Sequence, residues 1–348
     1  MSAHSSRRRF LALAAGASLA APFIRAARGQ ARTVYVNSYG GVWETSWRKA
    51  FFDPFTAQTG IAIKTVPGVS FAKLKAQVQR RNYECDVVNL GDVEYAQAVV
   101  EGLLEKVDRS AAKADQLPPN IVREFGITSY SLGTNLTYRK DRFPNGGPRS
   151  WADFWDVKRF PGARCLPDHS FTCLAFALLA DGVPADRLYP MDIDRAFRKM
   201  SEIKPHIKVW WREGSQSQQL IRDGEVDMIA IWSARAVDLI ADNVPLELVW
   251  NGAEIFNSNL IVAKGDPNAA AAWEFCNFVV QPKPQADFAM LLPYGPVNPE
   301  ARALMAEWRL RQTPAWPENE KVAFRHDAAW LAPRLAEIRE RWSQWLTT

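Results

Sequence analysis

The sequence lacks the usual marks of a redox, zinc or membrane protein. Among its 348 residues are only four cysteines, none spaced as C-x-x-C, so redox and zinc-ribbon motifs find no support. The apolar run over 10–21 is too short to cross a bilayer as a stable helix, and no later apolar stretch is long and clean enough to do so. Tandem repeats, low-complexity tracts and linkers rich in Gly or Ser are also absent. If the chain forms two domains, we expect ordered segments to join them.

Motifs of the common hydrolases are missing too. The sequence contains neither the G-x-S-x-G of a nucleophile elbow nor the H-E-x-x-H of a zinc protease. His206 and His326 lie far from His169 in the sequence and have no metal-ligand spacing to it. We therefore expect no enzyme activity, no metal site and no cofactor. A hydrolase assay would test the expectation of no enzyme activity, and a metal analysis would test the expectation of no metal site.

The first 31 residues have the composition of a signal peptide. Three arginines at 7–9 precede an apolar run over 10–21, and Gly29 and Ala31 supply the small residues of a cleavage point. Residues 6–11 also fit the twin-arginine export pattern, with the Sec route as the alternative. We therefore predict a periplasmic protein whose signal peptide covers residues 1–31.

Export changes the meaning of the net charge. The whole sequence has 43 basic and 38 acidic residues, a formal net charge of +5. Residues 1–31 contain five arginines and no acidic residue, so the mature chain carries equal numbers of basic and acidic residues. Such a chain gives no support to a nucleic-acid or membrane-surface partner.

Strand and helix patterns alternate along the mature chain. Residues 33–39, 61–67 and 85–91 have the composition of strands, and a segment of helical periodicity follows each of them. A second series of the same kind follows between residues 163 and 250. This order predicts an α/β fold with parallel strands and right-handed crossovers. Residues 328–346 predict an amphipathic helix, whose apolar stripe we assign to core packing.

Ligands of parallel sheets bind beyond the carboxyl ends of the strands. Two segments with glycine are expected there, NSYGG at 37–41 and NLGDV at 89–93. Glycine allows the backbone to approach a ligand closely, but plain turn chemistry alone would explain both segments better. Asp168 and His169 also follow a strand, and Asp168 is expected to contact a ligand, to cap the next helix, or both.

The cysteines leave two alternatives open. The periplasm permits disulfides, and Cys165 and Cys173 are close enough in sequence to pair. Buried free thiols are equally expected, since connectivity cannot be read from sequence.

Several segments carry a resemblance to a known family. They include the run P-x-S-W-x-D-F-W at 148–155, the strand ending in Ile-Trp at 231–232 and YGPVN at 294–298. The longer matching segments are 35–63, 86–95, 133–162, 223–236 and 259–282. With these, nearly the whole mature chain resembles the extracellular solute-binding proteins of ABC importers, and within them the spermidine/putrescine-binding branch.

The resemblance implies a two-lobe periplasmic-binding-protein fold of type II, which closes around its ligand by a hinge motion. Lobe one would comprise 32–133 plus 260–310, and lobe two 134–259. Residues 311–348 would form a helical segment that packs on the lobes. A monomer would capture a small organic solute, such as a polyamine-like amine, and deliver it to an inner-membrane ABC permease. The ligand-binding residues would be Ser38, Tyr39, Gly40, Gly41, Gly91, Asp92, Asp168, His169, Ser215, Trp232, Phe256, Asn257 and Ser258.

The pocket departs from the polyamine pattern in its acidic residues. Tyr39, Trp232 and Asp168 match the family's aromatic and carboxylate positions, where cation–π attraction and paired charge hold an amine. Phe171 and Ser258 stand where the polyamine binders have acids. A buried ammonium without a partner is costly, so a singly charged amine, a zwitterion or a more polar solute fits better.

Two further alternatives remain. Within transport, the solute could belong to another class, such as an amino-acid derivative, an opine or a phosphonate. Outside transport, the same fold could serve a periplasmic enzyme or a sensor subunit.

Overall fold

The computed structural model describes residues 32–68 and 70–348, and the predicted signal peptide lies outside them. These residues build one mixed sheet in the order β2-β1-β3-β8-β4-β7-β5-β6, with β9 paired to β4. The strands are β1 (Thr33–Ser38), β2 (Ala62–Pro67), β3 (Val87–Gly91), β4 (Ile127–Arg139), β5 (Arg164–Pro167), β6 (Ile207–Trp211), β7 (Met228–Trp232), β8 (Leu246–Val262) and β9 (Gly295–Pro296).

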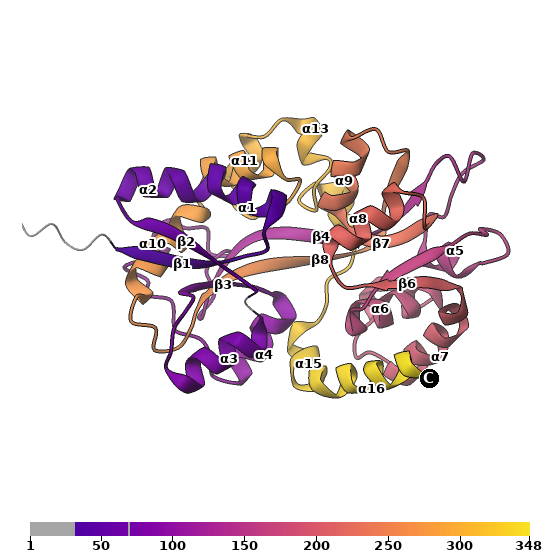
Figure 1. The fold of residues 1–348 in the computed structure, drawn as a ribbon, viewed down its shortest axis with the longest axis horizontal. Helices are drawn as coiled ribbons and strands as arrows, with labels where there is room; N and C mark the ends of the chain where they lie inside the picture. Colours follow the sequence, from indigo (N-terminus) through magenta and orange to yellow (C-terminus); the bar gives the residue numbers. More distant parts are fainter. Residues whose placement is uncertain (1–31, 69) are drawn as a thin grey trace, which may run out of the picture. The chain divides into compact units, whose positions relative to one another are not determined.

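Two long strands connect the ends of this sheet. β4 and β8 run antiparallel, from Ile127 opposite Leu260 to Arg139 opposite Leu246. At one end β8 pairs with β3, and at the other β4 pairs with β7. Figure 1 shows both strands passing from the half that carries β1–β3 to the half that carries β5–β7. Ordered segments therefore join the two halves, as expected from the absence of a linker rich in Gly or Ser.

Within each half the remaining strands are parallel. β1 lies between β2 and β3, and β5 between β6 and β7, in parallel register. Parallel neighbours need crossover connections, which explains why helices alternate with these strands. The helices are α1 (Gly41–Trp47), α2 (Asp53–Thr59), α3 (Phe71–Arg80), α4 (Asp92–Val100), α5 (Trp151–Trp155), α6 (Ser170–Ala180), α7 (Ile193–Ile203), α8 (Gly214–Arg222), α9 (Ser233–Ala241), α10 (Ala269–Val279), α11 (Pro282–Leu291), α12 (Pro299–Ala303), α13 (Glu307–Leu310), α14 (Pro317–Val322), α15 (Ala328–Leu331) and α16 (Leu335–Thr347).

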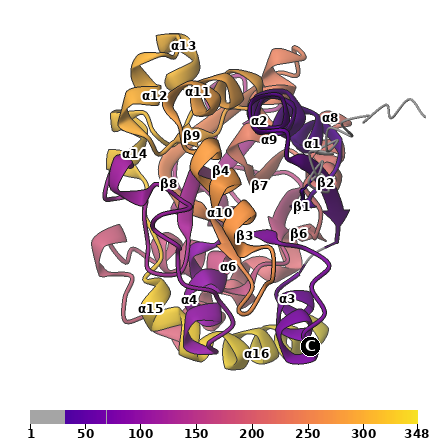
Figure 2. The same ribbon diagram turned by 90° about the vertical axis from the view of Figure 1, so that its left-hand side faces the viewer.

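Helices cover both faces of the sheet. Figures 1 and 2 show α1, α2, α9 and α11 on one face, and α3, α4, α6, α7 and α16 on the other. Each half has its own cluster of buried apolar side chains, one around Trp47 and Trp273 and one around Trp151 and Phe176. Trp151 and Phe176 stack with ring centroids 3.7 Å apart, so the P-x-S-W-x-D-F-W run serves the core.

The predicted C-terminal helix is real but interrupted. Residues 328–346 form α15 and α16, separated by a 3-10 turn at Ala332–Arg334 that contains Pro333. Proline cannot donate a backbone hydrogen bond inside a helix, which accounts for the break. Leu335 and Ile338 are buried as the apolar stripe predicts. The segment therefore packs on the core, as expected.

Candidate functional site

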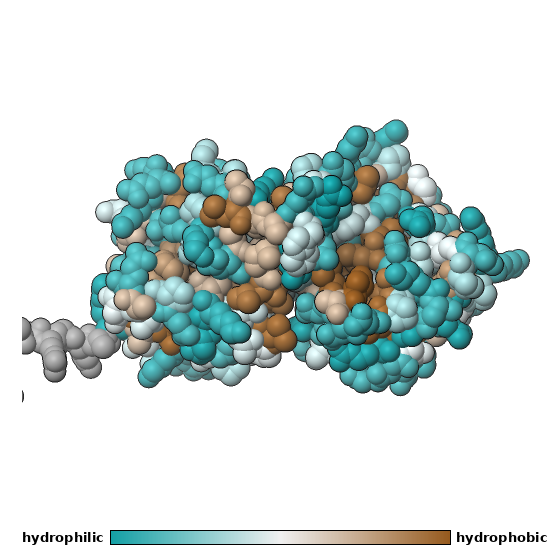
Figure 3. Space-filling model, turned by 90° about the horizontal axis from the view of Figure 1, so that it is seen from above, coloured by the Kyte–Doolittle hydropathy of each residue, from teal (hydrophilic) through white to brown (hydrophobic). Residues whose placement is uncertain are grey.

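The strand ends meet at one large cavity of about 900 Å³. Residues at the ends of β1, β3 and β7 line it, together with the N-terminal residues or N-caps of α1, α4, α6, α8 and α9. Helix N-termini present unpaired backbone N–H groups and favour anionic groups. On the face shown in Figure 3, hydrophobic residues gather in recesses between hydrophilic ones. The cavity thus lies where ligands of such sheets bind.

The turn between β1 and α1 forms one wall. Gly40 and Gly41 have φ angles of 66° and 55°, which residues with a Cβ rarely adopt, so this turn favours glycine. The side chain of Tyr39 is 58% exposed. Its ring lies edge-on to Trp43 at 5.1 Å, and its hydroxyl donates to the Asn89 carbonyl at 3.2 Å. An aromatic side chain is therefore presented to the cavity in a fixed position.

Two acidic residues on the β3–α4 side are already paired. Asp92 Oδ1 accepts from Arg123 Nη2 at 2.6 Å, and its Oδ2 accepts from the Asn257 backbone N–H at 2.8 Å. Glu94 Oε1 lies 3.2 Å from Arg339 Nη2. Each carboxylate has an arginine of the protein beside it, so this wall adds little net charge to the cavity.

The opposite wall carries Trp232 and Arg235 at the start of α9. Trp232 lies edge-on to Trp211 at 5.3 Å and remains partly exposed. A Cβ on Gly214 would lie 2.8 Å from the Trp232 ring, so a larger residue would displace that ring. Arg235 donates to Gln218 Oε1 at 2.9 Å and forms no ion pair within residues 32–68 and 70–348. This wall therefore offers a cation without a direct ion pair in the described residues, with the Asp238 carboxyl acting on it from the same helix and Glu213 lining the same wall.

Strand β8 crosses the cavity and contributes several residues to it. Glu254, Phe256 and Ser258 line the cavity from one face of the strand, and Ile255 between them also reaches it. Asn257 is not among the residues that line the cavity. Its Oδ1 lies 3.4 Å from Arg325 Nη1 instead.

Glu254 is a cavity residue that was not predicted. Its Oε1 accepts from Thr172 Oγ1 at 3.1 Å and is 2.8 Å from His326 Nε2. Burial disfavours the charged form, but hydrogen bonds from the side chains of His326 and Thr134 favour it, and the pKa of Glu254 lies below its ordinary value. The signal that could have revealed it is the period of two that relates it to Phe256 and Ser258.

Asp168 does not line the cavity. Two residues that also lie outside the cavity hold its carboxylate in place. Its Oδ2 accepts from Arg212 Nε at 2.8 Å, and its Oδ1 accepts from Trp342 Nε1 at 2.7 Å. It does not cap α6 either, because the N-cap is His169, whose side chain makes no capping bond. The expected capping role is therefore wrong, whereas contact between Asp168 and a ligand stays a prediction. In this structure Asp168 ties α16 to the turn between β5 and α6.

The other predicted site residues come together. The cavity is lined by Ser38, Tyr39, Gly40, Gly41, Gly91, Asp92, His169, Ser215, Trp232, Phe256 and Ser258. The Ser38 hydroxyl is engaged by the protein, since it donates to Glu44 Oε2 at 2.5 Å. His169 lies beside Trp232, with ring centroids 6.3 Å apart. Their contact with a ligand remains a prediction.

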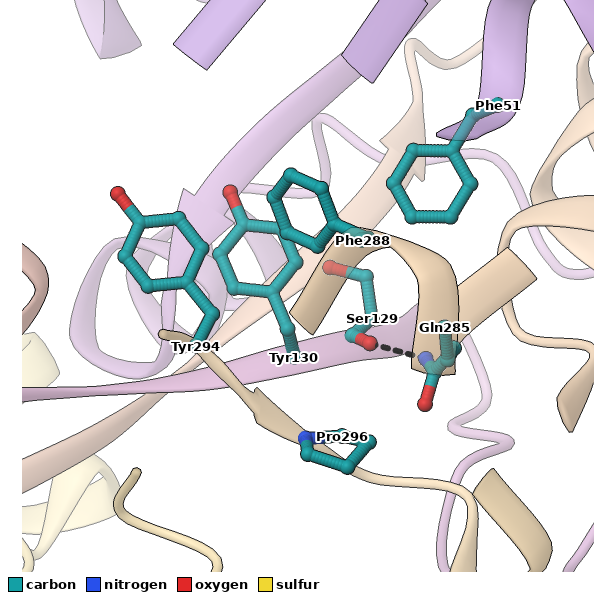
Figure 4. Close-up of a pocket in the computed structure, with 7 residues that line it drawn as sticks. All are labelled: Phe51, Ser129, Tyr130, Gln285, Phe288, Tyr294 and Pro296. Carbon is teal, nitrogen blue, oxygen red and sulfur yellow. Dashed lines mark hydrogen bonds between the residues drawn. The ribbon is translucent and has the colours of Figure 1, made fainter. Parts of the chain in front are cut away.

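A closed crevice beside the cavity holds part of its lining in place. Tyr130 and Tyr294 line both spaces and stack with nearly parallel rings 5.0 Å apart. Figure 4 shows their hydroxyls pointing the same way. Gln285 donates to the Ser129 carbonyl and accepts from the Asn298 backbone N–H at 3.0 Å. The crevice has no room for a water molecule, so its residues support the cavity wall.

The described residues offer few other sites. Cys85, Cys165, Cys173 and Cys276 are buried free thiols, so the disulfide alternative is not realised. Burial raises the pKa of the Cys165 thiol to about 12. Within residues 32–68 and 70–348, no group of three or more His, Cys, Asp or Glu is placed to hold a metal ion. Likewise, no helix in these ranges is long and apolar enough to span a membrane.

Comparison with known proteins identifies the family. The model of the family described as bacterial extracellular solute-binding protein matches residues 50–323. The gamma-aminobutyric acid (GABA)-binding protein of Pseudomonas aeruginosa is 33% identical over 332 residues, which cover 93% of each chain. The spermidine/putrescine-binding periplasmic protein of Escherichia coli is 22% identical over 80% of this chain and 83% of its own.

Solved structures agree with this assignment. The PBP AgtB from A. tumefaciens R10, in complex with agropinic acid, matches with a TM-score of 0.84 and 32% identity, covering 92% of this chain and 100% of its own. An ABC transporter substrate-binding protein from Bradyrhizobium japonicum USDA 110 matches with a TM-score of 0.86 and 34% identity, covering 90% and 99%. The predicted two-lobe α/β fold and the predicted resemblance are confirmed. The chain belongs to the bacterial extracellular solute-binding proteins, the family that supplies the substrate-binding components of ABC transporters.

Proposed function

We propose that the protein captures a small organic zwitterion, a solute with an anionic group and an amine, and delivers it to an ABC permease. The observation that carries this proposal is the lining of the cavity, in which Arg235 has no ion-pair partner among the residues that the structure describes while Glu254 is a buried carboxylate. A solute with one charge of each sign would satisfy both groups. A diamine would leave Arg235 without a partner and place a second cation in the same cavity.

The anionic end would be held at the wall formed by α8 and α9. Arg235 supplies a planar guanidinium that suits a carboxylate. Ser215, in the first turn of α8, also lines the cavity, so backbone N–H groups of that turn are available to the same anion. This arrangement supports a carboxylate or a similar acidic group as one end of the solute.

The apolar part of the solute would lie between aromatic side chains. Tyr39 and Trp232 come from opposite walls, and Phe256 comes from the strand that crosses between the halves. Aromatic faces bury carbon chains and attract cations. The known relatives support this size class, since the named ligands of two of them are GABA and agropinic acid.

We further propose that residues 1–31 direct export and that the mature monomer works in the periplasm without cofactor and without chemistry of its own. The lobes would comprise 32–133 plus 260–310 and 134–259, with 311–348 packed on them. The two clusters of buried apolar side chains, centred on Trp47 and Trp151, support this division. Closure would then be a hinge motion within β4 and β8.

The first experiment is mass spectrometry of small molecules released from the purified protein, followed by calorimetric titration of ligand-free protein. The probes are GABA, putrescine and butanoate, which differ in their charged ends. We expect GABA to bind most tightly. Arg235→Met should weaken GABA about 10- to 100-fold, the worth of a hydrogen-bonded charge pair, without weakening putrescine.

The matched control is Arg212→Met, which removes an arginine outside the cavity. It should leave the affinity for GABA unchanged. Putrescine as the tightest ligand, or a full affinity for GABA in Arg235→Met, would contradict the proposed solute class.

A further inference from the structure

We propose that Glu254, positioned by His326 and Tyr189, is the subsite that receives the cationic nitrogen of the solute, a primary ammonium or a guanidinium group. The inference rests on the proposed function, because it assigns one end of a solute bound in the same cavity. It adds a recognition element built from three distant parts of the chain: strand β8, the loop before α7 and the segment between α14 and α15.

Glu254 stands apart from the other acids of the cavity. It is only 3% exposed, and its single ion-pair candidate in the described residues is His326 at 2.8 Å. Asp92 and Glu94, by contrast, each lie beside an arginine. A buried carboxylate without a permanent cation is costly to the fold. A cation that arrives with the ligand would remove that cost.

Tyr189 determines which nitrogen of His326 carries the proton. The Tyr189 hydroxyl is 2.5 Å from His326 Nδ1, and within the described residues it has no other hydrogen-bond acceptor. Burial raises the pKa of Tyr189 above its ordinary value, so the hydroxyl keeps its proton and donates it to Nδ1. His326 then carries its proton on Nε2 and donates it to Glu254 Oε1. In this arrangement His326 is neutral and Glu254 retains a full negative charge.

The hydrogen bonds also orient the carboxylate. Oε1 accepts both from His326 and from Thr172, so Oε2 is the oxygen that remains for a solute. The Thr134 side chain also stabilises the carboxylate. An incoming ammonium would therefore meet a carboxylate whose position is fixed before binding, which lowers the cost of association.

The first test compares GABA with butanoate, which lacks only the amine, and with butylamine, which lacks only the carboxylate. At about pH 7.5 the wild type should prefer GABA to butanoate about 10- to 100-fold, as expected for a hydrogen bond to a charged group. Glu254→Gln should abolish this preference. Glu247→Gln, on the same strand but outside the cavity, should retain it. Loss of the preference in both variants, or in neither, overturns the proposal.

The same titrations separate the subsite from the proposed function. If GABA fails to bind but butylamine binds and loses affinity in Glu254→Gln, the zwitterion class is wrong and the subsite stands. If neither amine binds, the subsite is overturned together with the proposed solute class. Thermal unfolding of each variant verifies that it is folded.

The role of His326 as a hydrogen-bond donor is tested by substitution. In His326→Gln the amide can still donate to Glu254, so the preference for GABA over butanoate should persist, whereas His326→Phe removes the donor and should reduce the preference. Nitrogen NMR of the ligand-free protein should show the proton of the His326 ring on Nε2. A proton on Nδ1, or equal preferences in the two variants, would overturn the assignment.

Discussion

Two edges of the sheet bury carboxyl groups in opposite ways. At the cavity edge, hydrogen bonds from His326 and Thr134 oppose the effect of burial, and the pKa of Glu254 lies below its ordinary value. At the other edge, Asp86 precedes β3 and Asp266 follows β8. There burial, together with the nearby Asp86 carboxyl, raises the pKa of Asp266 to about 7.

The difference shows how the surroundings of a buried acid decide its charge. Donors around Glu254 stabilise the carboxylate, whereas a second carboxyl beside Asp266 favours a shared proton. The edge away from the cavity binds no ligand in the proposed function, so one of its two acids can stay protonated without any effect on recognition. The cavity edge needs a fixed negative charge if it is to recognise a cation.

The largest expected effect concerns Asp266. Its folded pKa of about 7 exceeds the ordinary value of 3.8, so the folded state retains a proton that the unfolded chain releases. Stability is therefore present in full below about pH 4 and is lost as pH rises through about 7, by on the order of 4 kcal/mol. Asp266→Asn can donate to Asp86 as the protonated acid does, and should remove this loss.

Urea denaturation between about pH 4 and pH 7.5 measures the loss of stability that Asp266 causes. The stability of Asp266→Asn relative to the wild type should increase with pH. Glu318→Gln, which removes an exposed acid, should follow the wild type throughout. If Asp266→Asn also follows the wild type, then Asp266 is ionised in the folded protein at neutral pH.

The next prediction sets Asp92 against Glu254. Asp92→Asn leaves Arg123 without its anion and should lower the free energy of unfolding of the ligand-free protein by about 1–2 kcal/mol. Glu254→Gln removes a buried charge that has no permanent cation, so it should leave stability unchanged or raise it. Urea denaturation of both variants at neutral pH tests this contrast. A larger loss of unfolding free energy in Glu254→Gln than in Asp92→Asn would contradict the prediction.

Sequence patterns were most informative where local chemistry sets the structure. The segments 37–41 and 89–93 and the residue Trp232 lie at strand ends, and all contribute to the cavity lining. Parallel strands bring their carboxyl ends together, so these positions follow from the order of elements alone. The C-terminal stripe was equally visible, because apolar spacing shows which side of a helix is buried.

Contacts between distant residues were beyond sequence reasoning. Asp168 has the sequence context of a helix cap, yet its carboxylate accepts a hydrogen bond from Trp342, which lies 174 residues further along the chain. Glu254 obtains its hydrogen bond from His326, 72 residues away. Local patterns cannot encode such partners.

The smallest expected effect concerns the aromatic part of the cavity, where both walls should contribute to binding without adding charge. Trp232→Ala should weaken GABA about 3- to 10-fold, the worth of one aromatic contact, because Trp232 is only partly buried and faces the cavity. The control is Trp308→Ala, which truncates a 56% exposed tryptophan outside the cavity and should leave the affinity unchanged. Calorimetric titration measures both variants. An unchanged affinity in Trp232→Ala would remove this ring from the site and leave recognition to the charges, whereas a loss as large as that of Arg235→Met would mean that stacking and charge contribute equally.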